Sequence, residues 1–406
     1  MHAPTPPLLF LRDAELFDPQ ARGRKDLLIA DARVAAIVEP GELDAQLSGL
    51  GSALVETVEL DGALVTPGLV DAHVHVTGGG GEGGYTSRVP SLTLTELSAA
   101  GVTSVVGLLG TDATTRTMRE LVARTLALRE EGLSAWCWTG NYEVPVKTLT
   151  GSVRDDMAFV DPIIGVGELA ISDHRSSQPS FDEFLRVASD VHVGGMISGK
   201  AGVLHLHLGD GARGLELVRR ALDETELPAR VFHPTHLNRR RELFAEACTL
   251  AGERGERAPV MDVTAFPADD VGDGLSAAEA IAAWLGAGLD PARLTCSSDG
   301  GGCMPHFGDD GQLSHYGVGQ SATLLETLRA LTGEFGRGLA EVLPMFTANV
   351  AQQLRLRGKG RVAVGADADL LVLRGAQDLE LDAVLARGQW MVRAGTVLRR
   401  GPFEGP

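Results

Sequence analysis

The 406-residue sequence predicts an α/β fold: a (β/α)8 TIM-like barrel with a small β-sandwich domain formed by both termini. Eight short apolar runs rich in β-branched residues recur along the middle of the chain, and amphipathic stretches such as 114–132 and 240–255 separate many of them. Toward both ends, apolar and polar residues alternate at period two, which is typical of half-exposed antiparallel strands. We therefore expect the small β-sandwich domain in residues 1–64 plus 357–406, and the barrel in residues 65–356.

The expected elements follow one another in a regular order. Short strands with polar turns are predicted in the first part of the chain and again near its end, and neither segment is long enough to bury a good core alone. One domain that joins the two segments is the simplest arrangement. The barrel strands are predicted within the runs 63–76, 102–110, 134–140, 163–172, 201–209, 229–237, 258–266 and 292–300.

Charge and composition argue against several classes of protein. Acidic residues outnumber basic ones by 54 to 36, and the net charge of −18 argues against a nucleic-acid partner, which would require clustered Lys and Arg. No apolar run reaches 18 residues, and the start of the chain shows no signal-peptide pattern, so we expect no membrane association. The four cysteines are far apart without CxxC spacing, which favours reduced thiols and a cytoplasmic location.

Two histidines end the first predicted barrel strand, at the face where a barrel of this kind carries its chemistry. His73 and His75 are one residue apart, so the period of a strand turns both side chains to the same side. They can therefore bind one metal ion from the barrel interior. The alternative, a pair of surface histidines, is disfavoured by the apolar run that precedes them.

Two carboxylates occupy comparable positions. Glu168 lies in the fourth run, where an ionised carboxylate facing inward needs a cationic partner, either a metal ion or an arginine. Asp299 ends the eighth run and is followed by glycines that leave room for a ligand. An aspartate at this position could bind a metal ion and also take a proton from a bound water.

The fifth and sixth runs each contain two histidines, His205 with His207 and His233 with His236. Not all four can be ligands, and we favour His207 and His236 because strand ends face the site. Imidazole nitrogens and carboxylate oxygens are the ligand set of hydrolytic zinc. No Ser-His-Asp or cysteine-nucleophile pattern competes, and no GxGxxG opens a helix after a strand.

This pattern resembles the amidohydrolase superfamily, which has HxH after strand one, a bridging group on strand four, His on strands five and six, and Asp on strand eight. Within that superfamily the chain is most similar to the isoaspartyl (β-aspartyl) dipeptidase family, along nearly its whole length. The segment 358–373 is typical of the superfamily's small β domain. The closer likeness lies in GGGGEGG (78–84), GVTSVVGLLGTD (101–112), TGNYEVP (139–145), TGSVRDD (150–156), ISDHRS (171–176), PTHLNR (234–239) and SSDG (297–300).

The resemblance implies a metallo-dipeptidase that hydrolyses dipeptides in which aspartate is linked through its side-chain carboxyl. Two zinc ions per subunit would activate a bridging water to hydroxide. One ion, the more buried, would be bound by His73, His75 and Asp299. The other would be bound by His207 and His236.

The resemblance also implies roles around the metal ions. Asp299 would be the general base that accepts the proton of the water and passes it to the leaving amine. The Tyr142 hydroxyl would donate to the oxyanion. Glu82 matches the residue that receives the free α-amino group of the substrate, and Gly80 and Thr111 match positions of backbone contact.

Because the substrate is acidic, it needs local positive charge on this negatively charged protein. Arg175 and Arg239 match the carboxylate-binding arginines of the family, and a planar guanidinium suits that role. Without the resemblance, Arg175 could equally be a solvated arginine of a loop. Cys303 stands where the family has a serine near the substrate carboxylate, and a thiol is a weaker donor than a hydroxyl.

Glu168 is the other departure from the family pattern. The best-known members have a carboxylated lysine bridging the metals at this position, and no lysine lies between Lys147 and Lys200. Glutamate is shorter, so a bridging Glu168 requires the metals to lie nearer the fourth strand or the backbone to shift inward. Other branches of the superfamily use glutamate here. We therefore expect two zinc ions bridged by Glu168, with no dependence of activity on bicarbonate.

Three other functions are compatible with parts of this pattern. Another metal-dependent amidohydrolase, acting on N-acyl-amino acids or cyclic amides, would keep the metal residues without requiring Glu82, Tyr142, Arg175 and Arg239 together. Deamination is a lesser alternative, because some deaminases of the superfamily use glutamate. A non-catalytic scaffold would typically have lost ligands, which are all present here. The resemblance also suggests a homo-oligomer.

Overall fold

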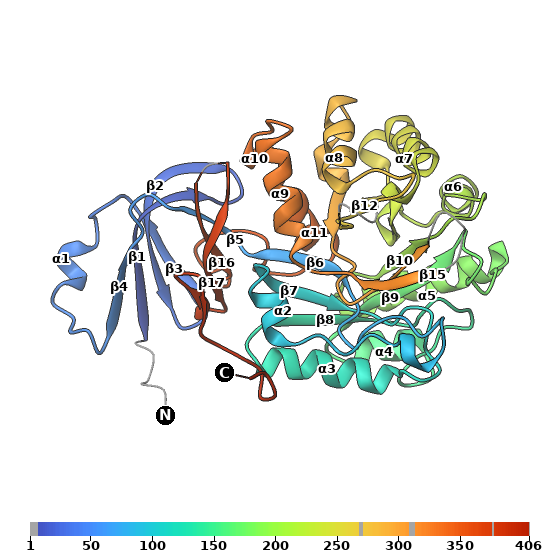
Figure 1. Cartoon of the computed structure of the whole chain (residues 1–406), viewed down its shortest axis with the longest axis horizontal. Helices are drawn as coiled ribbons and strands as arrows, with labels where there is room; N and C mark the ends of the chain where they lie inside the picture. Colours follow the sequence, from blue (N-terminus) through green and yellow to red (C-terminus); the bar gives the residue numbers. More distant parts are fainter. Residues whose placement is uncertain (1–6, 268–270, 308–312, 376, 406) are drawn as a thin grey trace.

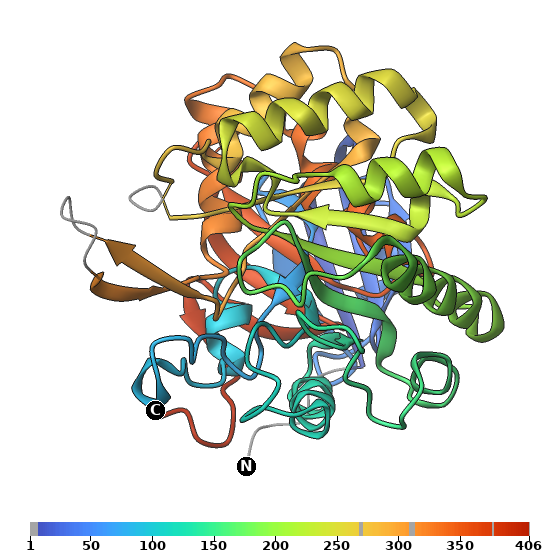
Figure 2. The same cartoon turned by 90° about the vertical axis from the view of Figure 1, so that its right-hand side faces the viewer.

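The computed structural model describes residues 7–267, 271–307, 313–375 and 377–405. Figure 1 shows two adjoining bodies: a β domain at the left, built from both ends of the chain, and a larger body of alternating strands and helices at the right. Figure 2 views the larger body from its far end, where helices surround the central strands.

Eight parallel strands form the barrel, one in each predicted run. Six of them pair in the order β11-β10-β9-β8-β7-β6, and β12 pairs with β13. Their bounds are β6 Leu69–Val74, β7 Val102–Gly107, β8 Ser134–Thr139, β9 Ile163–Ile171, β10 Val203–Leu208, β11 Phe232–Thr235, β12 Met261–Thr264 and β13 Leu294–Ser297.

Strands β12 and β13 close the ring between β11 and β6. The backbone N–H of His75, just after β6, donates to the carbonyl of Gly300, just after β13, over 2.8 Å. On the other side, the Thr235 hydroxyl of β11 donates to the Asp262 carboxylate of β12 over 2.7 Å. The predicted (β/α)8 barrel is confirmed, and the C-terminal ends of its strands meet at one face.

Helices follow the strands, and local sequence explains where the longest one begins and ends. Helix α5 (Phe181–Ser198) starts with a capping box between Ser180 and Glu183 and ends at Gly199, which adopts a left-handed conformation with φ of 70°. The other helices of the barrel are α2 Leu94–Ser98, α3 Met118–Glu130, α4 Val153–Phe159, α6 Glu216–Glu224, α7 Arg241–Arg254, α8 Ala277–Gly286, α9 Thr323–Gly333, α10 Leu339–Val342 and α11 Ala348–Gln353.

A hairpin that the sequence did not predict follows β13. Its strands are β14 (Cys303–Phe307) and β15 (Leu313–Val318), which pair in antiparallel fashion. The hairpin extends outward from the side of the barrel in Figure 2. It begins only four residues after Asp299, so its first residue, Cys303, stays beside the strand ends.

The terminal domain contains one nine-stranded sheet and the short helix α1 (Asp44–Leu47). Eight of its strands follow the order β19-β18-β17-β16-β5-β1-β2-β3, and β4 pairs with β1. The predicted small β domain from both termini is confirmed. Its strands are β1 Leu8–Phe17, β2 Ala21–Ala30, β3 Arg33–Val38, β4 Val55–Glu59, β5 Leu64–Pro67, β16 Leu370–Arg374, β17 Glu380–Ala386, β18 Gln389–Arg393 and β19 Thr396–Val397.

The two ends of the chain meet where β5 pairs with β16 in antiparallel register. Leu11, Val65 and Leu370, from three different strands, are buried in the core of this sheet. β5 begins at the predicted boundary, at Leu64, yet still belongs to the terminal sheet, and only Gly68 separates it from β6 of the barrel.

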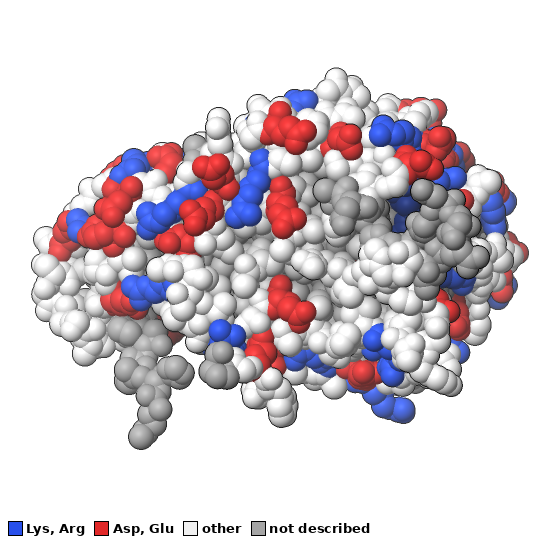
Figure 3. All heavy atoms as spheres, viewed as in Figure 1, with Lys and Arg blue, Asp and Glu red and all other residues white. Residues whose placement is uncertain are grey.

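The surface carries both signs of charge. On the face seen in Figure 3, acidic and basic side chains are interspersed rather than gathered into one basic field. None of the helices in the described parts of the chain is long and apolar enough to cross a membrane.

A buried lysine joins the two bodies. Lys359 is 4% exposed, and its Nζ lies 2.6 Å from Asp369 Oδ2 and 2.8 Å from Asp367 Oδ2. The same ammonium donates to the hydroxyl of Ser134, at the start of β8, over 2.5 Å. The terminal segment is thereby tied to the barrel through one charged group.

We predict that Lys359→Met lowers the free energy of unfolding by about 3–5 kcal/mol, because it removes the counter-ion of the buried Asp369 carboxylate and of the half-buried Asp367 carboxylate. Urea unfolding followed by circular dichroism measures the change. The matched control is Lys25→Met, which removes an exposed pair with Glu39 and should change stability by less than about 1 kcal/mol. Equal effects of the two substitutions would contradict this account of the junction.

Candidate metal and substrate site

A cavity of about 370 Å³ brings the predicted site residues together from positions between 75 and 303. Of the predicted residues, His73 alone is missing from its wall, because it is fully buried directly behind His75. The predicted residues that line the cavity are His75, Gly80, Glu82, Thr111, Tyr142, Glu168, Arg175, His207, His236, Arg239, Asp299 and Cys303.

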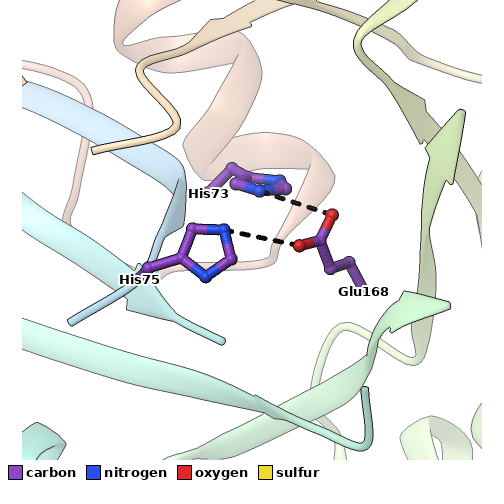
Figure 4. A group of neighbouring side chains, drawn as sticks. All are labelled: His73, His75 and Glu168. Atoms are coloured by element: carbon purple, nitrogen blue, oxygen red, sulfur yellow. Dashed lines mark ion pairs between the residues drawn. The ribbon is translucent and has the colours of Figure 1, made fainter. Parts of the chain in front are cut away.

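The HxH pair faces a glutamate from across the barrel. His73 in β6 and His75 just after it both point toward Glu168 of β9 (Figure 4). Nε2 of His73 lies 3.5 Å from Glu168 Oε2, and Nε2 of His75 lies 3.4 Å from Oε1. Asp299 Oδ1 lies 3.3 Å and 3.1 Å from the same two nitrogens. Two imidazoles and two carboxylates thus converge on one point.

The histidines of the fifth and sixth strands approach the other side of Glu168. Nδ1 of His207 lies 2.9 Å and Nε2 of His236 lies 3.6 Å from Glu168 Oε2. His205 and His233 instead lie deeper in the barrel, away from the cavity wall. Among the residues that the structure describes, three groups have ligand atoms within 4.8 Å of one another: His73, His75, Glu168; His73, His236, Asp299; and Glu168, His207, His236.

Two of these residues have an unusual backbone. His236 and Asp299 have φ of 61° and 54°, in the left-handed region that residues with a Cβ avoid. Such conformations cost on the order of 1–3 kcal/mol each and cluster at functional sites. His236 is the first residue after β11 and Asp299 is the second residue after β13, so this backbone turn determines where their side chains enter the cavity.

Burial shifts the pKa values of His73 and His207 and that of Glu168 in opposite directions. Desolvation lowers the pKa of His73, and it lowers that of His207 to about 3, so these imidazoles are neutral at physiological pH. Desolvation also raises the pKa of Glu168 well above that of an ordinary glutamate, and the nearby Asp299 carboxylate raises it further. A divalent cation at this point would stabilise the ionised form of Glu168, which the neutral histidines cannot do.

The donor atoms fit a metal ion. His73 Nε2, Glu168 Oε1 and Asp299 Oδ1 are all buried, and none has a well-aligned hydrogen-bond partner among the described residues. Buried polar atoms are rarely left in that state in proteins. Imidazole nitrogens with carboxylate oxygens are typical zinc ligands, and Glu168 belongs to two of the three groups. The arrangement can therefore hold metal.

The residues predicted to bind the charged ends of a substrate contact one another. Arg175 Nη1 lies 3.1 Å from Glu82 Oε1, and the Thr111 hydroxyl donates to the same oxygen over 3.0 Å. Opposite charges are thus presented side by side at the cavity wall. This pair can accept a zwitterion, whose ammonium would meet Glu82 and whose carboxylate would meet Arg175.

Tyr142 and Arg239 complete the polar wall. The Tyr142 hydroxyl lies 2.8 Å from His207 Nδ1, and burial raises its pKa well above the ordinary value, with the charge of Glu168 adding to the rise. It therefore stays a hydrogen-bond donor at neutral pH. Arg239 lies against the ring of Phe266, and its buried Nε has no hydrogen-bond partner within the described part of the chain.

Cys303 lies against the glycine run. A side chain at Gly80 would place its Cβ 3.0 Å from Cys303 Cβ and 2.3 Å from the carbonyl of Ser87, and Gly80 also has φ of 75°. Glycine is therefore required at position 80. Desolvation raises the pKa of Cys303 to about 11, with the charge of Glu82 contributing, so the thiol is not a nucleophile at neutral pH.

Asp173 is a site residue that the sequence reasoning missed, although it lies in the ISDHRS stretch. Its Oδ2 lies 3.0 Å from His207 Nε2 and 2.8 Å from Arg175 Nη2. Burial acts to raise its pKa, but the hydrogen bonds to His207 and Arg175 outweigh this and hold the pKa well below the ordinary value. A carboxylate at this position makes His207 donate from Nε2 and leaves Nδ1 free toward Glu168.

Arg116 is a second missed residue. It is 4% exposed and donates to the carbonyls of Thr77, Gly79 and Val89, the last two over 3.0 and 2.7 Å. Its side chain thereby holds the glycine run in place beneath Glu82. A buried arginine that bonds only to backbone gives no sequence signal beyond its charge.

Comparison with known proteins agrees with this geometry. Residues 64–391 match the sequence profile described as "Amidohydrolase family". The chain belongs to the amidohydrolase family. It is an enzyme of that metal-dependent family, and its residues include groups that can hold the metal.

The structure is most informatively compared with β-aspartyl dipeptidase of Fervidobacterium islandicum AW-1, whose structure in complex with β-Asp-Leu is 38% identical and covers 98% of this chain and 100% of that one, with a TM-score of 0.87. A second structure of that enzyme is 37% identical, with the same TM-score. The resemblance to isoaspartyl dipeptidases is thereby confirmed.

Two further matches are more distant. A D-hydantoinase is 15% identical over 97% of each chain, with a TM-score of 0.66, and this likeness extends to the fold alone. A dihydroorotase of Desulforapulum autotrophicum is 36% identical over 70 residues, which is 17% of this chain and 15% of that protein. The chain therefore matches only a small part of that curated relative.

Gly110 gives a test of the metal site away from the ligands themselves. An added Cβ would lie 2.8 Å from Cε1 of His75. We predict that Gly110→Ala displaces His75 and weakens zinc binding about tenfold or more, as measured by competition with a chelating dye. Gly333→Ala, where no atom lies within 4 Å of the new methyl, should leave the affinity unchanged. Unchanged affinity in Gly110→Ala would contradict the assignment of His75.

Proposed function

We propose that the protein is a binuclear zinc peptidase that hydrolyses β-aspartyl dipeptides. The observation that carries this proposal is the coincidence, around one cavity, of the histidine–carboxylate cluster with the Glu82–Arg175 pair. The cluster suits amide hydrolysis in general, while the paired charges suit a small zwitterion. The 38% identity over nearly the whole chain to an enzyme crystallised with β-Asp-Leu supports the same substrate class.

In this proposal two zinc ions are held around Glu168, one by His73, His75 and Asp299 and the other by His207 and His236. When bound, zinc supplies the Lewis acidity that activates water and polarises the scissile carbonyl. Asp299 Oδ1, with no hydrogen-bond partner among the described residues, is the base that takes the proton and returns it to the leaving amine. Tyr142 donates its hydroxyl hydrogen to the developing oxyanion.

Substrate recognition follows from the charges of the cavity wall. Glu82 receives the free α-amino group, and Arg175 and Arg239 bind the carboxylates, while the glycine run around Gly80 and Thr111 allows the close approach of the ligand. Cys303 offers a weaker donor than serine near the carboxylate. We further propose a cytoplasmic location, since all four cysteines are free thiols. We also propose a homo-oligomeric state.

The direct test is hydrolysis of β-Asp-Leu beside α-Asp-Leu by zinc-loaded protein. We expect turnover of the β-linked peptide alone, and a loss of kcat/KM of about 10² or more in Glu82→Gln, because the ammonium loses a charged partner. Glu143→Gln, an exposed carboxylate paired with Lys147, serves as control and should behave as the unmodified protein. No turnover of either peptide by protein with bound zinc would contradict the proposal and direct the search to N-acyl and cyclic amides.

Removal of one hydroxyl tests the role of Tyr142. We predict that Tyr142→Phe lowers kcat by about 10²–10³ with little change in zinc content, because an oxyanion donor is lost. Steady-state kinetics with β-Asp-Leu and metal analysis provide the two readouts. Tyr85→Phe is the control, since Tyr85 is 87% exposed. An unchanged kcat in Tyr142→Phe would remove this residue from the mechanism.

Because residue 168 is a glutamate, we predict that recovery of activity after zinc is added does not depend on carbon dioxide. Zinc added to metal-stripped protein should restore the same activity in bicarbonate-free buffer as in buffer with bicarbonate, because Glu168 carries its carboxylate already and needs no carboxylation. Recovery that requires bicarbonate would show that another residue bridges the metals.

A further inference from the structure

Three histidines of the barrel interior that do not line the cavity, His73, His205 and His233, form a continuous chain beneath it. His73 Nδ1 lies 2.8 Å from His205 Nε2, and His205 Nδ1 lies 3.0 Å from His233 Nδ1. His233 Nε2 in turn lies 3.0 Å from the Thr295 hydroxyl. Three imidazoles from β6, β10 and β11 are thus linked in series to a hydroxyl of β13.

The chain ends at a buried carboxylate. The Thr295 hydroxyl lies 2.6 Å from Asp262 Oδ1, and the hydroxyls of Thr235 and Ser297 lie 2.7 and 2.6 Å from Oδ2. Three hydroxyls that all donate to one aspartate are the arrangement expected of a carboxylate that only accepts hydrogen bonds. The other acceptor near the Thr295 hydroxyl is the carbonyl of Met261 at 3.3 Å, and this group also can only accept.

The direction of every link then follows. Since Thr295 donates its hydrogen to an acceptor, its oxygen must accept from His233 Nε2. A neutral imidazole has one donor and one acceptor nitrogen, so His233 Nδ1 accepts from His205 Nδ1. His205 Nε2 therefore accepts from His73 Nδ1. Nε2 of His73 is left with a free lone pair, 3.3 Å from Asp299 and 3.5 Å from Glu168.

We propose that His205, His233 and Thr295 are positioning residues that hold His73 in the tautomer whose Nε2 can bind a metal ion. The inference rests on the part of the proposed function in which His73 binds metal, and it is independent of which amide is hydrolysed. The alternative role for His205 is packing, because its ring is stacked on Trp138 with centroids 5.1 Å apart. Positioning of His73 requires one particular nitrogen of His205 to carry the proton, whereas stacking on Trp138 does not depend on which nitrogen carries it.

Nitrogen-15 NMR of histidine-labelled, zinc-loaded protein reads the tautomers directly. We expect His205 with its proton on Nδ1 and His233 with its proton on Nε2, the two opposite forms, and His73 protonated on Nδ1. His205 protonated on Nε2, or the same tautomer in both deep histidines, would overturn the proposal. This measurement uses the unmodified protein and no peptide, so its result is separate from that of the hydrolysis assay.

The second readout is the zinc affinity of two variants that are substituted at His205. His205→Leu removes the acceptor for His73 and should weaken binding at that site 10–100-fold. His205→Gln offers a carbonyl oxygen near the position of Nε2 and should stay within about threefold of the unmodified protein, although the stacking is lost in both. The matched control is His192→Leu, which replaces a half-buried histidine of α5. Equal loss in the leucine and glutamine variants would assign His205 to packing and overturn the proposal.

Discussion

The burial of two carboxylates, Glu168 and Asp299, among neutral imidazoles is the constraint around which the site is organised. Burial lowers the pKa of His73, His207 and His236, and so removes the positive charge that these three rings could offer the two acids. An uncompensated buried charge is destabilising, so the barrel core suits a bound cation, which would supply positive charge beside the two carboxylates. A bound cation also accounts for two other features of the site. It would occupy the unpaired ligand atoms, and it gives a reason for the strained backbone that places His236 and Asp299.

A second layer of residues holds these ligands from outside the cavity. Asp173 orients His207, Arg116 binds the carbonyls of the glycine run, and a line of histidines supports His73. Each of these groups is buried and bonds to the ring or backbone that it positions. The layer matters because a ligand misplaced by a fraction of an ångström loses much of its affinity for metal.

The fold and most of the wall could be predicted from the sequence for definite reasons. Eight β-branched runs separated by amphipathic stretches specify the barrel, and the residues at the run ends, such as Asp299, converge because parallel strands end at one face. The hairpin of β14 and β15 was not predicted, since its strand signals lie among loop residues. Asp173 was missed because only its contacts with His207 and Arg175, which the structure shows, distinguish it from a surface acid.

The histidine pairs illustrate where sequence reasoning stops. Period two places His205 and His207 on one face, and only the position of His207 nearer the strand end favoured it as the ligand. That His207 contacts Glu168 while His205 contacts His233 required the structure. Similarly, the charges of Glu82 and Arg175 were visible in the sequence, but their contact, and hence the recognition of opposite charges side by side, required the structure.

Anomalous scattering at the zinc edge, from crystals grown with zinc and without bicarbonate, tests the central claim most directly. The account predicts two peaks in each barrel, one beside His73, His75 and Asp299 and one beside His207 and His236, with one oxygen of Glu168 directed at each. A single peak, or a Glu168 carboxylate turned away from the metal, would contradict it.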